Sequence, residues 1–221
     1  MDKTIDFESE ISSSLNLLPS ATTAAIRTVR RGFSKRLAEA RADFVVSLAL
    51  QLLKSDKEIP RWFAYELVQH HPDAMRSLKS REIELLGEGI DSWVAVDTFT
   101  CYLSGPAWRE GQIPDSLIAR WASSKNRWWR RAAVVSTVPL NNKARGGQGD
   151  TARTLRICQL VIHDRDDMVI KALSWALREL SKRDSKAVKT FLNKNQPSLA
   201  SRVVREVNNK LTTGLKNPTK L

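Results

Sequence analysis

The 221-residue sequence lacks the features that several protein classes require. It has only two cysteines, Cys101 and Cys158, which lie far apart and outside any CxxC motif, so neither a disulfide framework nor a zinc site is expected. No apolar run approaches the ~18 residues of a membrane span, and the acidic, polar N-terminus lacks the apolar core of a secretion signal. We therefore expect a protein of the reducing cytoplasm that has no membrane attachment.

Common catalytic motifs are missing as well. The sequence contains no nucleophile elbow, no HExxH and no phosphate-binding glycine loop. Two of its three histidines, His70 and His71, lie at a predicted helix end, and His163 is isolated, so we interpret all three as structural or surface residues. Any reaction must rely on other side chains.

Positive charge is in excess, with a formal net charge of +12. Residues 27–41 hold six basic residues and one acidic, residues 116–149 seven basic and none acidic, and residues 171–221 twelve basic and three acidic. Such clusters favour a polyanionic partner, above all nucleic acid. The alternative is a solvated outer helix face, which we favour for four residues: Lys182, Arg183, Lys186 and Lys189.

Apolar residues at helical spacing dominate from about Thr22 onward, and no convincing run of strands is present. We therefore expect an all-α fold. Predicted helices begin near residues 61, 91, 127 and 167, about 30 to 40 residues apart, and Arg61-Trp62 is echoed by Arg127-Trp128. This recurrence favours a HEAT-like helical-repeat solenoid, an α-α superhelix with a concave basic cleft, over an irregular helical bundle.

The expected organisation is a flexible leader over residues 1–20, a single repeat domain over residues 21–217 and a tail over residues 218–221. Residues 139–150, PLNNKARGGQGD, are rich in Gly and Asn and predict a loop. We favour a flexible connection; the alternative is a basic loop that touches phosphate through Lys143 and Arg145.

The segment DSWVAVDTF, residues 91–99, carries an acid inside a helical apolar pattern. Asp91 is a plausible N-cap, but Asp97 follows Trp93 by four positions, so both side chains lie on one helix face. Two later helices also pair a tryptophan with a polar residue one turn on. The three predicted pairs are Trp93 with Asp97, Trp128 with Arg131, and Trp175 with Arg178.

A carboxylate among indoles suits a reaction with a cationic transition state. Cleavage of a glycosidic bond builds oxocarbenium character on the sugar, which a nearby carboxylate stabilises, while an indole face attracts a cation such as an alkylated purine. The alternative is that Asp97 is a buried acid paired with an arginine, and Arg131 or Arg178 would then be its partner.

The segments DSWVAVDTF, NRWWRRAAVV and DDMVIKALSWALREL are similar to those of a known family. From about Thr22 to Lys216 the chain resembles the AlkD-like DNA alkylation repair proteins, which are DNA glycosylases built of HEAT-like repeats. The resemblance implies excision of N3- and N7-alkylated purines from duplex DNA held in a concave basic cleft, without a metal or organic cofactor.

The resemblance also implies residue roles. Asp97 matches the catalytic aspartate, Trp93 and Trp175 match the two tryptophans of the site, and Arg131 and Arg178 match its arginines. We further expect five residues of the acid-free basic segment to contact DNA: Trp128, Arg127, Arg130, Lys143 and Arg145.

Three functions remain open at this stage. The first is a monomeric DNA glycosylase acting in base excision repair. The second is a non-catalytic DNA-binding repeat protein, which would show salt-dependent duplex binding without base release. The third is a protein-interaction scaffold, which would show no salt-sensitive affinity for DNA.

Overall fold

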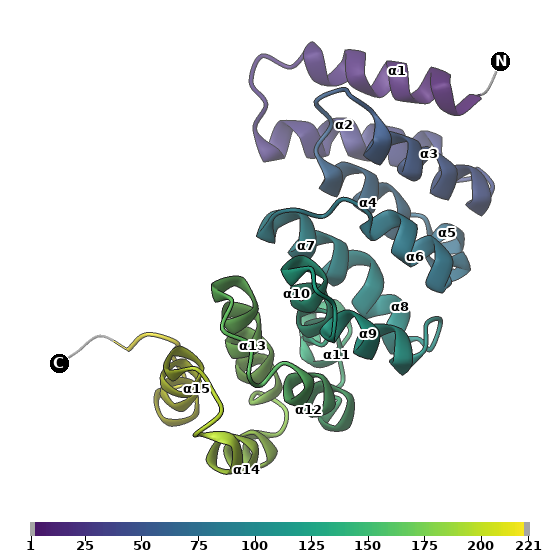
Figure 1. The fold of residues 1–221 in the computed structure, drawn as a ribbon. Helices are drawn as coiled ribbons and strands as arrows, with labels where there is room; N and C mark the ends of the chain where they lie inside the picture. The colour runs from purple at the N-terminus through teal and green to yellow at the C-terminus, as the bar shows by residue number, and fades with distance from the viewer. Residues whose placement is uncertain (1–2, 219–221) are drawn as a thin grey trace. The chain divides into compact units, whose positions relative to one another are not determined.

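The computed structural model describes residues 3–218, and over this range helices are joined by short loops with no β-strand (Figure 1). The all-α prediction is therefore confirmed. No helix in this range is both long and apolar enough to cross a membrane. Residues 1–2 of the predicted leader and residues 219–221 of the predicted tail lie outside the described part of the chain.

The chain divides into two compact units, Met1–Gly89 and Ile90–Leu221. The boundary follows Gly89, whose φ of 73° lies in the left-handed region that glycine adopts without strain. Sequence analysis places residues 21–217 in one repeat domain, because the helical periodicity continues through this point without a long linker. Each unit is described by itself below.

The first unit consists of short helices that pack on one another in pairs. Helix α1 packs on α3, α2 packs on α4, and α3 also contacts α4, α5 and α6. The hydroxyl of Thr22 starts α2 by accepting a hydrogen bond from the backbone N–H of Ala25. The bounds are α1 (Lys3–Asn16), α2 (Thr23–Arg36), α3 (Ala42–Lys54), α4 (Arg61–Gln69), α5 (Pro72–Ser77) and α6 (Ser80–Gly87).

Most of the predicted flexible leader is a packed helix, so the expectation of loose attachment is wrong for α1. Ile11 is fully buried, and the Phe7 ring meets the rings of Phe33 and Phe44 edge-on, with centroids 6.3 and 5.8 Å apart. Phe7 and Ile11 are four residues apart, so they form one apolar stripe on α1. Because the residues around this stripe are acidic and polar, the average composition of the segment does not indicate a packed helix.

The second unit repeats a two-layer arrangement. In one layer α10 contacts both α7 and α13, and α13 in turn contacts α15; these helices lie side by side in Figure 1. Helices α9, α12 and α14 pack against members of this layer. The repeat-like packing is that of a helical-repeat solenoid. The first bounds are α7 (Trp93–Phe99), a π-helical turn η1 (Thr100–Ser104), α8 (Gly105–Arg109), α9 (Asp115–Ala122) and α10 (Arg127–Val135).

The remaining elements of this unit run to the C-terminal part of the chain. They are α11 (Val138–Asn141), a 3₁₀ turn η2 (Lys143–Arg145), α12 (Thr151–Leu160), α13 (Asp167–Leu180), α14 (Ser185–Asn195) and α15 (Ser201–Thr213).

Helix α7 is fixed in place at both ends. Ser92, and not the expected Asp91, is its N-cap, since the Ser92 hydroxyl accepts a hydrogen bond from the backbone N–H of Ala95. At the other end α7 continues through η1 into α8, where a Cβ on Gly105 would lie 2.9 Å from the carbonyl oxygen of Ser136. Only glycine allows the backbones of α8 and the end of α10 to approach this closely.

We predict that Ile11→Ala destabilises the protein by about 2–4 kcal/mol, because the substitution leaves a cavity in a packed site. Leu17→Ala is the matched control, since Leu17 is 83% exposed, and it should change stability by less than about 0.5 kcal/mol. Urea unfolding followed by circular dichroism measures both. Equal effects of the two substitutions would contradict a packed α1.

Candidate functional site

The second unit joins Asp97 of α7 to Arg131 of α10 through a two-point contact. Arg131 donates from Nε to Asp97 Oδ1 at 2.9 Å and from Nη2 to Oδ2 at 2.8 Å. This parallel geometry is the strongest arrangement that a guanidinium and a carboxylate form. The alternative partner suggested by the sequence, Arg178, lies on α13 and makes different contacts.

Arg131 also ties a third helix to this pair. Its Nη1 donates a hydrogen bond to the backbone carbonyl of Met168, in the first turn of α13. One buried guanidinium therefore connects α7, α10 and α13. A shift of any of these three helices would break at least one charge-assisted hydrogen bond.

Asp97 is shielded but not sealed. Its side chain is 18% exposed, against 6% for Arg131. Burial raises the pKa of the Asp97 carboxyl above its ordinary value, and the hydrogen bonds and charge of Arg131 offset part of that rise. The site therefore holds a carboxylate in a partly dehydrated setting that solvent, or a ligand, still reaches.

Trp93 accompanies Asp97 on the exposed face of α7. Trp93 is the first residue of the helix and is 56% exposed, whereas Val96 and Phe99 are fully buried on the opposite face. An exposed indole of this size is unusual for a helix that has an apolar face to bury. It lies one turn before Asp97, as the sequence spacing predicts.

The predicted pairing of Trp128 with Arg131 is wrong, because Arg131 turns to Asp97. The guanidinium over the Trp128 ring is that of Arg127, 4.7 Å from the ring centroid, and Arg127 Nη1 also lies 3.6 Å from Asp166. Arg127 is about half exposed, so it stays available to a phosphate.

Arg130 is largely committed to holding loops together. Its Nε donates to Asp164 at 2.6 Å, and its Nη1 donates to the carbonyls of Ser124 and Lys125, both at 3.0 Å. These contacts join the loop before α10 to the loop before α13. Of the three neighbouring arginines on α10, only Arg127 therefore resembles a surface phosphate contact.

The 139–150 segment is not wholly the loop that the sequence predicts, because its first residues belong to α11 and Lys143–Arg145 form η2. Arg183 donates to the carbonyls of Asn141 and Gly147, and a Cβ at Gly147 would lie 2.5 Å from the carbonyl oxygen of Pro139. Lys143 and Arg145 are exposed on η2, and the Arg145 guanidinium lies 5.4 Å from the Tyr102 ring centroid. The segment presents both cations on a fixed turn.

Trp175 and Arg178 lie on α13 and are both partly exposed. Arg178 donates from Nε to the hydroxyl of Ser174 at 3.2 Å. Ser174 in turn binds Glu206 of α15, a buried acid that the sequence patterns do not single out. The available signal is that Glu206 lies between Val203 and Val207 on the apolar side of its helix, just as Asp97 interrupts an apolar pattern in α7.

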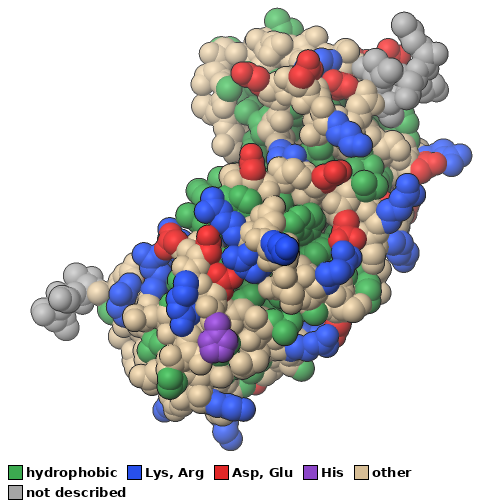
Figure 2. Space-filling model, viewed as in Figure 1, with side chains coloured by type: hydrophobic (Ala, Val, Ile, Leu, Met, Phe, Trp, Pro, Cys, Tyr) green, Lys and Arg blue, Asp and Glu red, His purple; other side chains and the backbone are tan. Residues whose placement is uncertain are grey.

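The positive charge of the chain belongs to the second unit. Residues 90–221 contain 23 Lys and Arg against 11 Asp and Glu, a balance of +12, whereas residues 1–89 contain 13 of each and are neutral. The basic cluster of residues 27–41 is therefore offset by acids elsewhere in its own unit. Figure 2 shows the Lys and Arg side chains spread over the second unit, interspersed with a smaller number of acidic ones.

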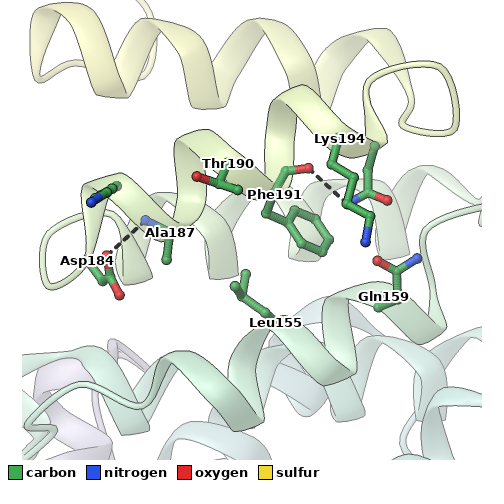
Figure 3. Close-up of a pocket in the computed structure, with 9 residues that line it drawn as sticks. Leu155, Gln159, Asp184, Ala187, Thr190, Phe191 and Lys194 are labelled. Carbon is green, nitrogen blue, oxygen red and sulfur yellow. Dashed lines mark hydrogen bonds between the residues drawn. The ribbon is translucent and has the colours of Figure 1, made fainter.

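A separate groove of about 460 Å³ lies between α12 and α14 and holds none of the predicted site residues (Figure 3). Leu155 and Phe191 face one another across it, and Lys194 reaches toward Gln159. No three His, Cys, Asp or Glu side chains among residues 3–218 are grouped as a metal site requires. The Asp97 and Arg131 pair, with the exposed Trp93 one turn before Asp97, is therefore the candidate site.

We predict that Arg131→Met raises the pKa of Asp97 further, because burial then acts without the opposing cation. Arg127→Met is the matched control on the same helix and should leave this pKa unchanged, since Arg127 pairs with Asp166. Carboxyl ¹³C NMR titration measures the pKa in each variant. A lower or unaltered pKa in Arg131→Met would contradict the pairing.

One of three comparisons with known proteins gives a match. Neither the curated proteins nor the solved structures that were searched contain a match to the chain. Residues 20–211, however, match the sequence profile of a family described as DNA alkylation repair enzyme. The match covers α2 to α14 and most of α15, including all of the candidate site. The chain belongs to the DNA alkylation repair enzyme family.

Proposed function

We propose that the protein is a DNA glycosylase that removes positively charged N3- and N7-alkylated purines from duplex DNA, with Asp97 as its catalytic residue. Family membership supports a role in the repair of alkylated DNA. The observation that carries the finer assignment is the Asp97 carboxylate, which is partly dehydrated, oriented at two points by Arg131 and flanked by the exposed Trp93.

Exposure separates Asp97 from two buried acids of the chain, Glu66 and Glu206. The side chain of Glu66 is 4% exposed and is held by two guanidinium groups, those of Arg27 and Arg30. Glu206 is 6% exposed. The side chain of Asp97 is at least three times as exposed as either, at 18%, and one guanidinium holds it. Of these three acids, Asp97 is the one that a sugar approaching the surface is best able to reach.

The proposed reaction needs few groups because the substrate is already a cation. When the glycosidic bond breaks, its electron pair goes to the purine nitrogen, so the alkylated base leaves neutral without a general acid. The sugar is left with oxocarbenium character, which the Asp97 carboxylate stabilises. Water then adds to C1′ and gives its proton to the carboxylate, which returns it to solvent.

Five of the other predicted residues hold the substrate in this proposal. Trp93 and Trp175 pack against the sugar and backbone beside the lesion, and their indole faces favour positive charge. Arg127, Lys143 and Arg145 are exposed cations suited to backbone phosphates. The charge of +12 on the second unit supports a duplex partner, because each neutralised phosphate releases counterions.

A duplex-binding protein without catalysis is the second candidate. It is favoured by the tightness of the pair itself, since Arg131 already neutralises the carboxylate that would have to stabilise a sugar cation. Such a protein binds DNA through the same basic unit and releases no base. Base release therefore discriminates between the two candidates.

We predict that Asp97→Asn lowers release of N7-methylguanine from a duplex at least about 100-fold under single-turnover conditions, as removal of a major electrostatic group does elsewhere. Asp91→Asn is the matched control, because Asp91 is exposed and lies outside α7. It should retain the wild-type rate. Equal rates for wild type and Asp97→Asn would remove Asp97 from the mechanism, and no release by wild type would select the non-catalytic candidate.

We also predict the direction of the pH dependence. Catalysis requires ionised Asp97, and burial raises the pKa of this carboxyl above 3.8. Activity should therefore fall, as the pH is lowered, at a pH above the ordinary aspartate value. Single-turnover rates between pH 4 and pH 8 test this, with circular dichroism recorded at each pH as the folding control. A rate that stays constant down to pH 4 in folded protein would contradict it.

A further inference from the structure

A buried chain of polar groups leads from α15 to Arg178. The Ser174 hydroxyl donates a hydrogen bond to Glu206 Oε2 at 2.5 Å, and it accepts one from Arg178 Nε at 3.2 Å. Ser174 is fully buried, and Glu206 is nearly so. The hydroxyl has a single proton, which goes to the carboxylate, so its lone pairs must face the arginine. The direction of the chain is therefore fixed.

Glu206 has two cationic partners on its far side. Lys216 Nζ lies 3.5 Å away and Arg202 Nε lies 3.9 Å away, both paired with Oε1. The other oxygen, Oε2, is the one that binds Ser174. A buried carboxylate is costly unless cations or hydrogen-bond donors compensate its charge. Here cations pair with one oxygen of Glu206, and Ser174 of α13 binds the other.

Arg178 has donors to spare at the outer end of this chain. Only its Nε has a hydrogen-bond partner among residues 3–218, so the two terminal amino groups are available. They form the edge of the guanidinium that binds phosphate at two points. Burial lowers the pKa of Arg178, while the charges of Glu206 and Glu179 oppose that fall. Arg178 is therefore a partly dehydrated cation that lies near two acids.

Arg178 also occupies the right place on its helix. It follows Trp175 by three positions and Lys171 by seven, so these three side chains share one face of α13. Arg131 is bound to the first turn of the same helix through Met168. A phosphate bound to Arg178 would therefore lie near the end of α13, while the candidate site contacts the first turn of the same helix.

We propose that Ser174 and Glu206 are positioning residues that hold Arg178 so that its two terminal amino groups bind a backbone phosphate of the duplex. This inference rests on the proposed function, since it names how one phosphate contact of that site is oriented. Neither residue touches DNA in this proposal. Their effect reaches the substrate only through Arg178.

The test measures duplex affinity and the excision rate separately. Arg178→Gln should weaken binding of an undamaged duplex about tenfold, and Ser174→Ala and Glu206→Gln should each weaken it about fivefold. At saturating protein, Ser174→Ala and Glu206→Gln should keep the single-turnover rate within about twofold of wild type, because neither residue touches the duplex in this proposal. In the Arg178→Gln background, Ser174→Ala should add less than about twofold, because the group that it positions is gone.

Two further variants separate positioning from general effects. Ser174→Thr keeps the hydroxyl and should restore affinity to within about twofold of wild type. Lys182→Gln removes one positive charge just beyond the same helix, from a lysine that pairs with Glu179, and should weaken binding less than about twofold. Thermal unfolding of each variant checks that the fold is retained.

The outcomes distinguish this inference from the proposed function. Wild type that excises base normally, with Ser174→Ala binding as tightly as wild type, overturns the positioning role alone. An undiminished effect of Ser174→Ala in the Arg178→Gln background overturns it too, since the serine would then act on stability or packing. Wild type that binds no duplex overturns both.

Discussion

The two-point contact between Arg131 and Asp97 is the interaction on which the candidate site depends. It joins a carboxylate of one helix to a guanidinium of another, and the same guanidinium also donates a hydrogen bond to the backbone of α13. The contact stabilises the fold only while both partners are present, because a buried carboxylate or guanidinium without its counter-charge is costly. The site is thus preorganised by the interactions that join its helices.

Acids of this kind recur in the fold, each between neighbouring helices of one unit. Glu66 of α4 binds two arginines of α2, Asp97 of α7 binds Arg131 of α10, and Glu206 of α15 binds Ser174 of α13. The pattern adds polar links to the apolar packing between these helices. An acid of this kind can contact a substrate only if it is partly exposed, and among these three Asp97 is the one that is partly exposed to solvent.

Much of this arrangement could be predicted from the sequence. The all-α fold follows from helical periodicity. For a paired Asp97 the sequence leaves two partners open, Arg131 and Arg178, and the structure has Arg131 as the partner. The predicted leader is wrong because Phe7 and Ile11, which pack α1 on its neighbours, stand among acidic and serine residues that hide the apolar spacing. The resemblance implies that Arg131 is the site arginine of α10, and in the structure its neighbour Arg130 binds Asp164 instead of Asp97. Ser174 and Glu206 were missed because their link crosses two helices and is visible only in three dimensions.

The central claim is that the Asp97 carboxylate faces the sugar of an alkylated nucleotide. The most direct measurement is a crystal structure of the protein bound to a duplex in which a pyrrolidine ring replaces one deoxyribose, since its protonated nitrogen imitates the oxocarbenium charge. The account predicts that this nitrogen lies within about 4 Å of an Asp97 oxygen, the distance of an ion pair, with Trp93 and Trp175 beside the ring. A bound duplex whose pyrrolidine nitrogen lies far from Asp97 would contradict it.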